Sequence, residues 1–249
     1  TILISELASD NAKDNGALYD IYGQIQRDAY LWNDMTSEDT DAPKYIWDAH
    51  YNAICSANQA LHAIELMGNP ENLNPQKGEA LLCRAYAHFQ LANLFCMPYN
   101  PQTADQELGI PYTTVPETEV MPDGIERGTL SQVYENINRD IEEGLPLIND
   151  EVYSVPKYHF NKRASYAFAA RFNLYYLKFD KVIEYASTVL GDNPVNDVRN
   201  WKSFSELATD FELRCNSYIA HTEPCNLMLI TAQTSWPYVH GPYGIGLRY

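Results

Sequence analysis

The sequence predicts a mainly all-α fold, a helical-repeat domain with long irregular loops and at most minor β structure. Two observations lead to this expectation. Apolar residues recur at intervals of three and four through much of residues 44–190, which is the period of one helix face. Glycine, proline and asparagine separate these segments, as expected at helix ends. Short connections favour antiparallel packing of consecutive helices.

The first helix pair is expected from residue 44 to the stop at Gly68, and from residue 74 to 97. Trp47, Tyr51 and Ile54 begin the apolar face of the first helix, and a Gly-Asn-Pro run follows its end. Asn74 is expected to cap the second helix, with proline at its first position. The proline-rich residues 98–128 are expected to be irregular.

Three further helices are expected downstream. Thr129 and Gln132 form a capping box at the start of the third helix. Asn161 is expected to cap the fourth, and the fifth spans residues 181–190 before a glycine. The last two resemble a tetratricopeptide helix pair, with small residues on the first and Asp180-Lys181-x-Ile183-x-Tyr185-Ala186 on the second.

We expect one domain over residues 1–249, with 1–43 loop-rich, 44–190 forming helix pairs, and 191–249 mostly irregular. The acidic stretch before residue 42 lacks the glycine and spacing of an EF-hand, so a solvated loop is expected there. The run Leu227-Met228-Leu229-Ile230-Thr231 is strand-like. It has no partner strand in this sequence, and a lone strand is not stable.

The charge balance excludes several classes of function. The chain has 249 residues, with 33 acidic and 17 basic side chains and a formal net charge of −16. This excess opposes binding to nucleic acid and to anionic lipid surfaces. No apolar stretch reaches the ~18 residues of a spanning helix, and the first residues lack the basic and apolar regions of a signal peptide. We expect no nucleic-acid partner and no membrane-spanning segment.

The sequence offers little chemistry for catalysis or metal binding. The spacing of Cys215 and Cys225 allows one disulfide, and His221 between them completes a Cys-x5-His-x3-Cys array. A structural zinc site needs four ligands, and the fourth is missing. Hydrolase, metalloprotease and nucleotide-binding motifs are absent, and the adjacent Glu142 and Glu143 cannot face each other across a cleft. We expect no metal, no cofactor and no catalytic residue.

Five segments, in order, resemble the SusD/RagB family of outer-membrane nutrient-binding lipoproteins. They are Trp47-x3-Tyr51-x2-Ile54-x3-Asn58, Gly78-Glu79-Ala80-x3-Arg84-Ala85-x3-Phe89-x-Leu91, Gly109-Ile110-Pro111, Arg127-x-Thr129-x3-Val133-Tyr134-x2-Ile137-x2-Asp140-Ile141, and Lys162-Arg163-x3-Ala167-x2-Ala170-Arg171-x3-Tyr175. Together they cover about residues 40–190, and five matches in order are more specific than any one.

The resemblance implies a glycan-binding lipoprotein on the surface of the outer membrane of a Gram-negative bacterium. Such a protein delivers oligosaccharide to a TonB-dependent (SusC-like) transporter and does not catalyse. The resemblance also implies that this chain is the tetratricopeptide-like N-terminal portion. The lipid-anchoring cysteine and the C-terminal half are expected to be missing from it.

Sugar binding indicates which residues to expect in a site. Pyranose rings stack on exposed aromatic rings, and their hydroxyls need amide, carboxylate or guanidinium partners. The segment Tyr30-Leu31-Trp32-Asn33 places aromatic rings beside an amide, with Asp10 in the preceding loop. Position in the family favours Trp32 and Asn33. A second candidate group lies in a glycine- and proline-rich stretch and comprises Trp236, Tyr238 and Tyr243.

Two other interpretations stay open. A helical repeat of this kind can serve as a protein-interaction scaffold without sugar binding, and a glycan-degrading enzyme is a further rival. Most of the 19 tyrosines fall on predicted helix faces, where packing between repeats accounts for them. Only the loop aromatics are left as ligand-binding candidates.

Overall fold

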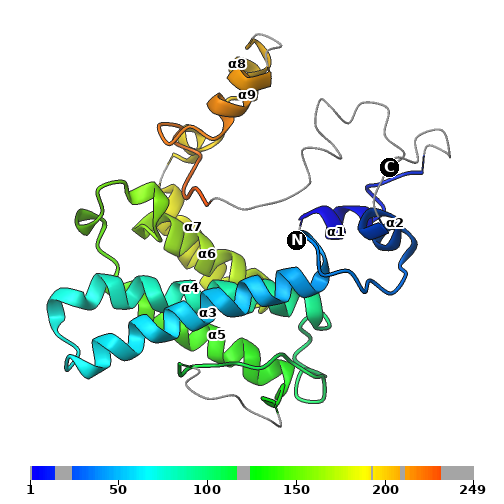
Figure 1. Cartoon of the computed structure of the whole chain (residues 1–249). Helices are drawn as coiled ribbons and strands as arrows, with labels where there is room; N and C mark the ends of the chain where they lie inside the picture. The colour runs from blue at the N-terminus through cyan, green and yellow to red at the C-terminus, as the bar shows by residue number, and fades with distance from the viewer. Residues whose placement is uncertain (1, 15–23, 117–123, 192, 208–210, 231–249) are drawn as a thin grey trace. The chain divides into compact units, whose positions relative to one another are not determined.

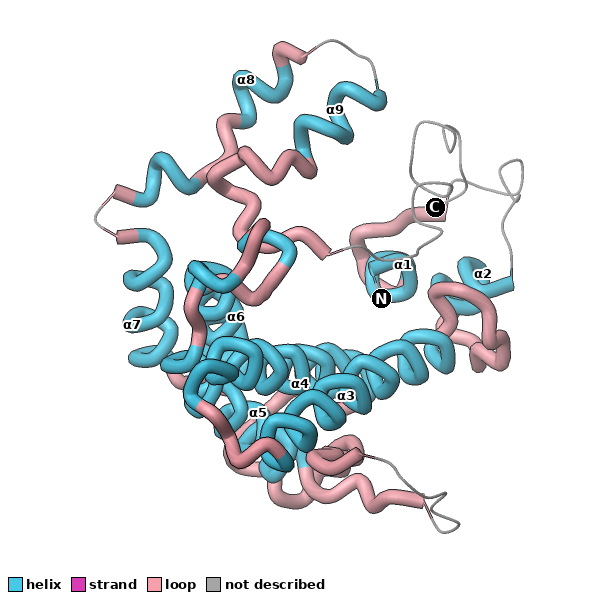
Figure 2. Tube along the Cα trace, turned by 60° about the vertical axis from the view of Figure 1, so that its left-hand side comes forward, coloured by secondary structure: helices cyan, strands magenta, loops and turns pink. Residues whose placement is uncertain are grey.

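The computed structural model describes residues 2–14, 24–116, 124–191, 193–207 and 211–230 (Figures 1 and 2). Its α-helices are α1 (Ile2–Leu7), α2 (Gln24–Leu31), α3 (Pro43–Leu66), α4 (Asn74–Phe95), α5 (Leu130–Gly144), α6 (Lys162–Tyr175), α7 (Phe179–Leu190), α8 (Trp201–Ser205) and α9 (Phe211–Tyr218). Within the described residues, β pairing is limited to one isolated bridge between Leu108 and Thr129. The prediction of a mainly all-α fold is confirmed.

The chain divides into two compact units, residues 1–49 with 231–249, and residues 50–230. In the first unit α1 packs against α2, and Leu7 and Ile25 are buried. This part was expected to be loop-rich, and the structure has two short helices there. Helices of six and eight residues repeat their apolar face too few times to stand out in a sequence.

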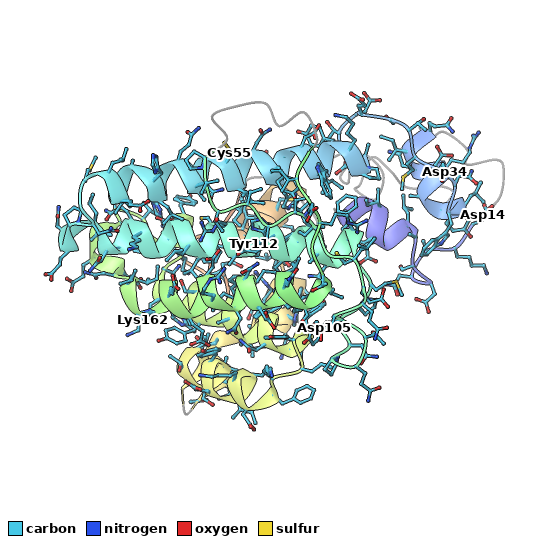
Figure 3. The ribbon with its side chains drawn as sticks, turned by 90° about the horizontal axis from the view of Figure 1, so that it is seen from below. Asp14, Asp34, Cys55, Asp105, Tyr112 and Lys162 are labelled. Atoms are coloured by element: carbon cyan, nitrogen blue, oxygen red, sulfur yellow. The ribbon has the colours of Figure 1, made fainter. Side chains whose placement is uncertain are left out.

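Helix α4 is the centre of the second unit. α3 and α5 run alongside it in Figures 1 and 3, and α4 is buried on more than one side, because Leu81, Leu82 and Phe89 are all inaccessible. The ring of Phe89 meets the rings of Phe168, Phe172 and Tyr175 on α6. Phe89, Phe168 and Phe172 are buried and form the hydrophobic core between the helix pairs, with Tyr175 at its exposed edge. None of the described helices is long and apolar enough to cross a membrane.

Consecutive helices pack antiparallel, as expected. On α4 and α5 the backbones come close at Gly78 and Gly144, where a Cβ on Gly78 would lie 2.8 Å from the Gly144 carbonyl oxygen. On α6 and α7 the rings of Tyr166 and Tyr185 meet at 5.7 Å. The Tyr185 hydroxyl also donates to Glu142 on α5 at 2.6 Å, so tyrosines join successive pairs.

The predicted helix caps are confirmed in two cases and wrong in one. The capping box of Thr129 and Gln132 is present at α5, and Asn161 caps α6 through the Ala164 amide. Asn74 is not the cap of α4. Leu73 holds that position without a side-chain hydrogen bond, because a 3-10 turn ends at Leu73 and runs directly into the helix.

The strand-like run near residue 227 is not a strand in its described part. The Leu229 amide donates to the Lys157 carbonyl at 2.7 Å, and the Asn161 side chain donates to the Leu227 carbonyl at 2.7 Å. These two bonds hold the run as an extended coil against the loop before α6. Leu227, Met228 and Leu229 are half-buried there and Ile230 is exposed, without the ladder that a sheet provides.

Candidate functional site

Trp32 lies directly after α2 in a left-handed backbone conformation, with φ of +56°. Its amide donates to the Ala29 carbonyl, and the Asn33 amide donates to the Asp28 carbonyl at 2.9 Å. This pair of bonds is a Schellman motif, in which the left-handed position is usually glycine. α3 ends in the same way at Gly68, whereas α6 uses Leu177. A bulky residue at this position costs about 1–2 kcal/mol.

The indole of Trp32 is 79% exposed, more than any other large hydrophobic side chain among the described residues. Packing in this unit therefore does not account for a tryptophan at a position that favours glycine. An exposed residue in a conformation of this kind is a candidate for binding. The indole presents a flat apolar surface to solvent.

Asn33 is held by the end of the helix beside it. Its Nδ2 donates to Oδ1 of Asp28 at 3.3 Å, and both oxygens of the buried Asp28 also accept from Nε2 of Gln24. The backbone and the side chain of Asn33 are thus both fixed to α2. Trp32 and Asn33 thus lie next to each other at the end of α2, with their backbones held by its last turn.

The structure places the other predicted residues less favourably. The Tyr30 hydroxyl accepts a hydrogen bond from the Asp14 amide at 3.0 Å, and the Tyr30 ring is half-buried. Tyr30 therefore has a structural role in holding the loop, besides any contact with a ligand. Asp10 is exposed in the loop after α1. Trp236, Tyr238 and Tyr243 lie outside the described residues.

The cysteines form no disulfide, and the described side chains form no metal-type cluster. All five cysteines are free thiols, so the disulfide that the spacing of Cys215 and Cys225 allowed is not formed. No group of three His, Cys, Asp or Glu side chains among the described residues is arranged to hold a metal ion.

A buried polar network lies at the centre of the second unit. Arg84 on α4 donates through Nε and Nη2 to the two carboxylate oxygens of Asp140 on α5, at 2.7 and 2.6 Å. Its Nη1 donates to Oδ1 of Asn58 on α3 at 3.0 Å. Burial disfavours the charged guanidinium, but the hydrogen bonds and charge of Asp140 outweigh this, and the pKa of Arg84 is raised.

The extended segment after α4 completes this network. The Tyr112 hydroxyl, labelled in Figure 3, donates to Oδ2 of Asp140 at 2.5 Å, and Nδ2 of Asn58 donates to the Thr113 carbonyl at 3.1 Å. Burial and the negative Asp140 raise the pKa of Tyr112, so the hydroxyl stays protonated. The network ties three helices and one loop together, and its polar groups satisfy one another.

His88 packs against this network and is fully buried. Its ring stacks on Tyr112 with centroids 3.8 Å apart, and Nδ1 donates to the Arg84 carbonyl at 2.9 Å. Nε2 has no hydrogen-bond partner among the described residues. Burial lowers the pKa of His88 to about 3, so the ring is neutral at physiological pH.

The polar network brings together residues from separate family-like segments of the sequence. Asn58, Arg84 and Asp140 come from three of the five family-like segments, and they meet at one point. A family model for SusD-like proteins, described as "Starch-binding associating with outer membrane", matches residues 2–174. This chain belongs to that SusD-like family. The sequence resemblance to SusD/RagB proteins is therefore confirmed.

Solved structures share the fold of this SusD-like chain. A SusD superfamily protein from Bacteroides thetaiotaomicron VPI-5482 is 22% identical with a TM-score of 0.61, over 82% of this chain and 44% of that one. One from Bacteroides fragilis is 24% identical with a TM-score of 0.60, over 78% and 44%. A laminarin-binding SusD-like protein is 21% identical with a TM-score of 0.52, over 76% and 38%. A comparison with curated proteins finds no match.

The chain spans less than half the length of these solved relatives. At this level of identity the likeness shows the shared helical fold. Asn58, Arg84 and Asp140 of the polar network are buried, so the network is not a candidate ligand site. The candidate site is the exposed Trp32 with Asn33, Tyr30 and Asp10 around it.

Proposed function

We propose that this chain is the glycan-capturing part of a cell-surface nutrient-binding lipoprotein. The observation that carries the proposal is the exposed indole of Trp32, fixed at a strained helix end in a member of a starch-binding family. A pyranose ring stacks on the indole, and its hydroxyls bond to the Asn33 amide group. Tyr30 and Asp10 line the edge, and Trp236, Tyr238 and Tyr243 are further candidates.

The ligand is a neutral oligosaccharide or polysaccharide. The net charge of −16 opposes polyanionic chains, and the family description names starch. One solved relative is described as laminarin-binding, and another as a putative sugar-binding protein from Bacteroides vulgatus. In this proposal the protein binds glycans without cleaving them.

The proposal includes a place and a partner. The protein lies on the outer surface of the outer membrane through a lipid anchor, and it hands its glycan to a TonB-dependent, SusC-like transporter. Affinity purification of the tagged protein from outer membranes tests this partner. Recovery of a TonB-dependent transporter is expected, and recovery of none would contradict this part of the proposal.

Isothermal titration of the purified chain with laminarin and malto-oligosaccharides tests glycan binding. Saturable binding of at least one neutral glycan is expected, with no shorter products on chromatography afterwards. Shorter products would show an enzyme instead. Absence of binding to a broad panel of neutral glycans by the folded chain would contradict the proposal.

A protein-interaction scaffold is the second candidate, and one observation favours it. Apolar side chains are exposed on neighbouring parts of α6 and α7, namely Leu174, Tyr175, Phe179 and Ile183. Such a surface suits a protein partner. It is compatible with the first proposal when that partner is the transporter, and it replaces the first proposal only when no glycan binds.

A further inference from the structure

A second exposed aromatic cluster lies on α8 and α9, which run side by side in Figures 1 and 2. Trp201 and Phe204 of α8 meet at 5.9 Å, and Tyr218 of α9 lies 6.5 Å from Trp201 and 6.0 Å from Phe204. We call these residues and Arg199 the Trp201 cluster. It lies beyond residues 2–174, which the family model matches.

Exposure separates the rings of this cluster into two kinds. Phe204 is half-buried and packs between the two helices. Trp201 is 59% exposed and Tyr218 is 47% exposed. If these rings served only as a small hydrophobic core, Trp201 would be expected to be the most buried of them, because tryptophan has the largest apolar surface to remove from water. The two exposed rings, inclined by 40° to each other, form an open, bent surface.

Arg199 holds this surface in place through contacts with the Tyr218 ring and with the backbone and side chain around it. Its guanidinium carbon lies 4.0 Å from the centre of the Tyr218 ring and 5.8 Å from the Trp201 ring. Nη2 donates to the Tyr218 carbonyl and to Oδ1 of Asn226, both at 2.9 Å. Nδ2 of Asn226 donates in turn to the Tyr218 and Ala220 carbonyls. The cluster is thus ordered before any ligand arrives.

The hydrogen-bonding capacity of Arg199 is only partly used. Its bonds within the described residues all run through Nη2, so Nε and Nη1 are available as donors beside two exposed rings. Flat apolar faces with fixed donors at their edge suit a sugar ring, whose C–H face stacks while its hydroxyls accept. A purely apolar partner would leave those donors unpaired at a cost.

We propose that the Trp201 cluster is a second glycan-binding surface, which takes neutral hexopyranose chains by stacking on Trp201 and Tyr218 and by hydrogen bonds from Arg199. This inference rests on the proposed glycan-binding function and adds a separate surface to it. By analogy with the stacking of nucleobases on aromatic side chains, we expect each ring to contribute roughly tenfold in affinity.

Titration calorimetry with laminarin tests the surface, comparing the unaltered chain with Trp201→Ala and with Tyr158→Ala. Tyr158 is 59% exposed, as Trp201 is, and serves as the matched control. Trp201→Ala should weaken binding at this surface about tenfold, and Tyr158→Ala should leave it unchanged. If laminarin binds to the unaltered chain and equally to Trp201→Ala, the second surface is wrong while the proposed function stands.

If Trp201→Ala unfolds α8 and α9, its loss of binding is uninformative, so a second measurement uses the unaltered chain. The indole N–H signal of Trp201, assigned with Trp201→Phe, should shift in ¹H–¹⁵N spectra when laminarin is added. An unmoved signal at saturating laminarin would overturn the assignment. If the same signal showed tighter binding of polygalacturonate than of laminarin, the choice of neutral glycans would be overturned.

Discussion

Arg84 and Asp140 form a buried, two-bonded ion pair between α4 and α5, with Nε–Oδ2 and Nη2–Oδ1 distances of 2.7 and 2.6 Å. Asn58 and Tyr112 bond to the same pair from α3 and the extended segment. Asn58, Arg84 and Asp140 lie in three of the family-like segments. With Tyr112 they join three helices and the extended segment of the second unit.

Removing one member of this pair should destabilise the chain strongly. Arg84→Met leaves the Asp140 carboxylate buried without its countercharge, which should lower the free energy of unfolding by about 3–5 kcal/mol. Urea unfolding measures this. The double variant Arg84→Met with Asp140→Leu should recover part of the loss, because no charge is then left buried. The exposed pair of Lys44 and Asp48 is the control, and Lys44→Met should leave the midpoint unchanged.

His88 should make the stability depend on pH. Its pKa is about 3 in the folded chain and about 6.5 in the unfolded one. Between these values only the unfolded state binds the proton, so stability falls as pH is lowered from 6.5 towards 3, by up to about 1.4 kcal/mol per pH unit. Above 6.5 the ring is neutral in both states and contributes no slope.

The variant His88→Phe keeps a ring beside Tyr112 and removes the titrating group. Unfolding measured at several pH values should show a shallower decline for this variant between pH 6.5 and 4. Equal slopes for the two proteins would mean that the pKa of His88 is not lowered in the folded chain. The comparison isolates His88 because the carboxylates are the same in both chains.

Close packing of α4 on α5 requires glycine at position 78. A Cβ there would lie 2.8 Å from the Gly144 carbonyl oxygen and from Cβ of Leu147, so the backbones must separate. Gly78→Ala should cost about 1–3 kcal/mol in urea unfolding, although alanine is the better helix former. Gln76→Ala, at an exposed position of the same helix, should cost almost nothing. A stabilised Gly78→Ala variant would contradict the packing.

Replacing Trp32 should lower glycan affinity without lowering the free energy of unfolding. Glycine removes the left-handed penalty, so Trp32→Gly should leave the free energy of unfolding unchanged or raise it by up to ~1 kcal/mol. The same variant should lose glycan affinity. Leu177→Gly, at the equivalent position of α6, should behave alike in thermal melts but keep full affinity. A large stability loss in Trp32→Gly would place the indole in a core.

The sequence predicted the helix pairs because their periods and caps are local features. The capping box at Thr129 and the cap at Asn161 depend only on residues three positions apart, and both are present. The start of α4 was misplaced by one position, because Leu73 belongs to a preceding 3-10 turn. A turn of three residues leaves no periodic pattern.

The polar network was not predicted, for a physical reason. Asn58, Arg84 and Asp140 are far apart in the chain, and their meeting depends on the relative rotation of three helices. In the sequence each was a polar residue within a separate family-like segment, and nothing local indicated its partners. Exposure is equally non-local. The sequence placed Trp32 among the loop aromatics, and only the folded chain gives its exposed fraction of 79%.

Titration of laminarin and malto-oligosaccharides into the unaltered chain, Trp32→Ala and Tyr158→Ala decides whether a glycan binds at Trp32. Tyr158 is 59% exposed in the second unit and is the matched control. The unaltered chain and Tyr158→Ala should bind a neutral glycan equally, and Trp32→Ala should bind it about tenfold more weakly with an unchanged melting temperature. Equal binding by all three variants, or none by the folded, unaltered chain, would contradict the assignment of Trp32 to a glycan site.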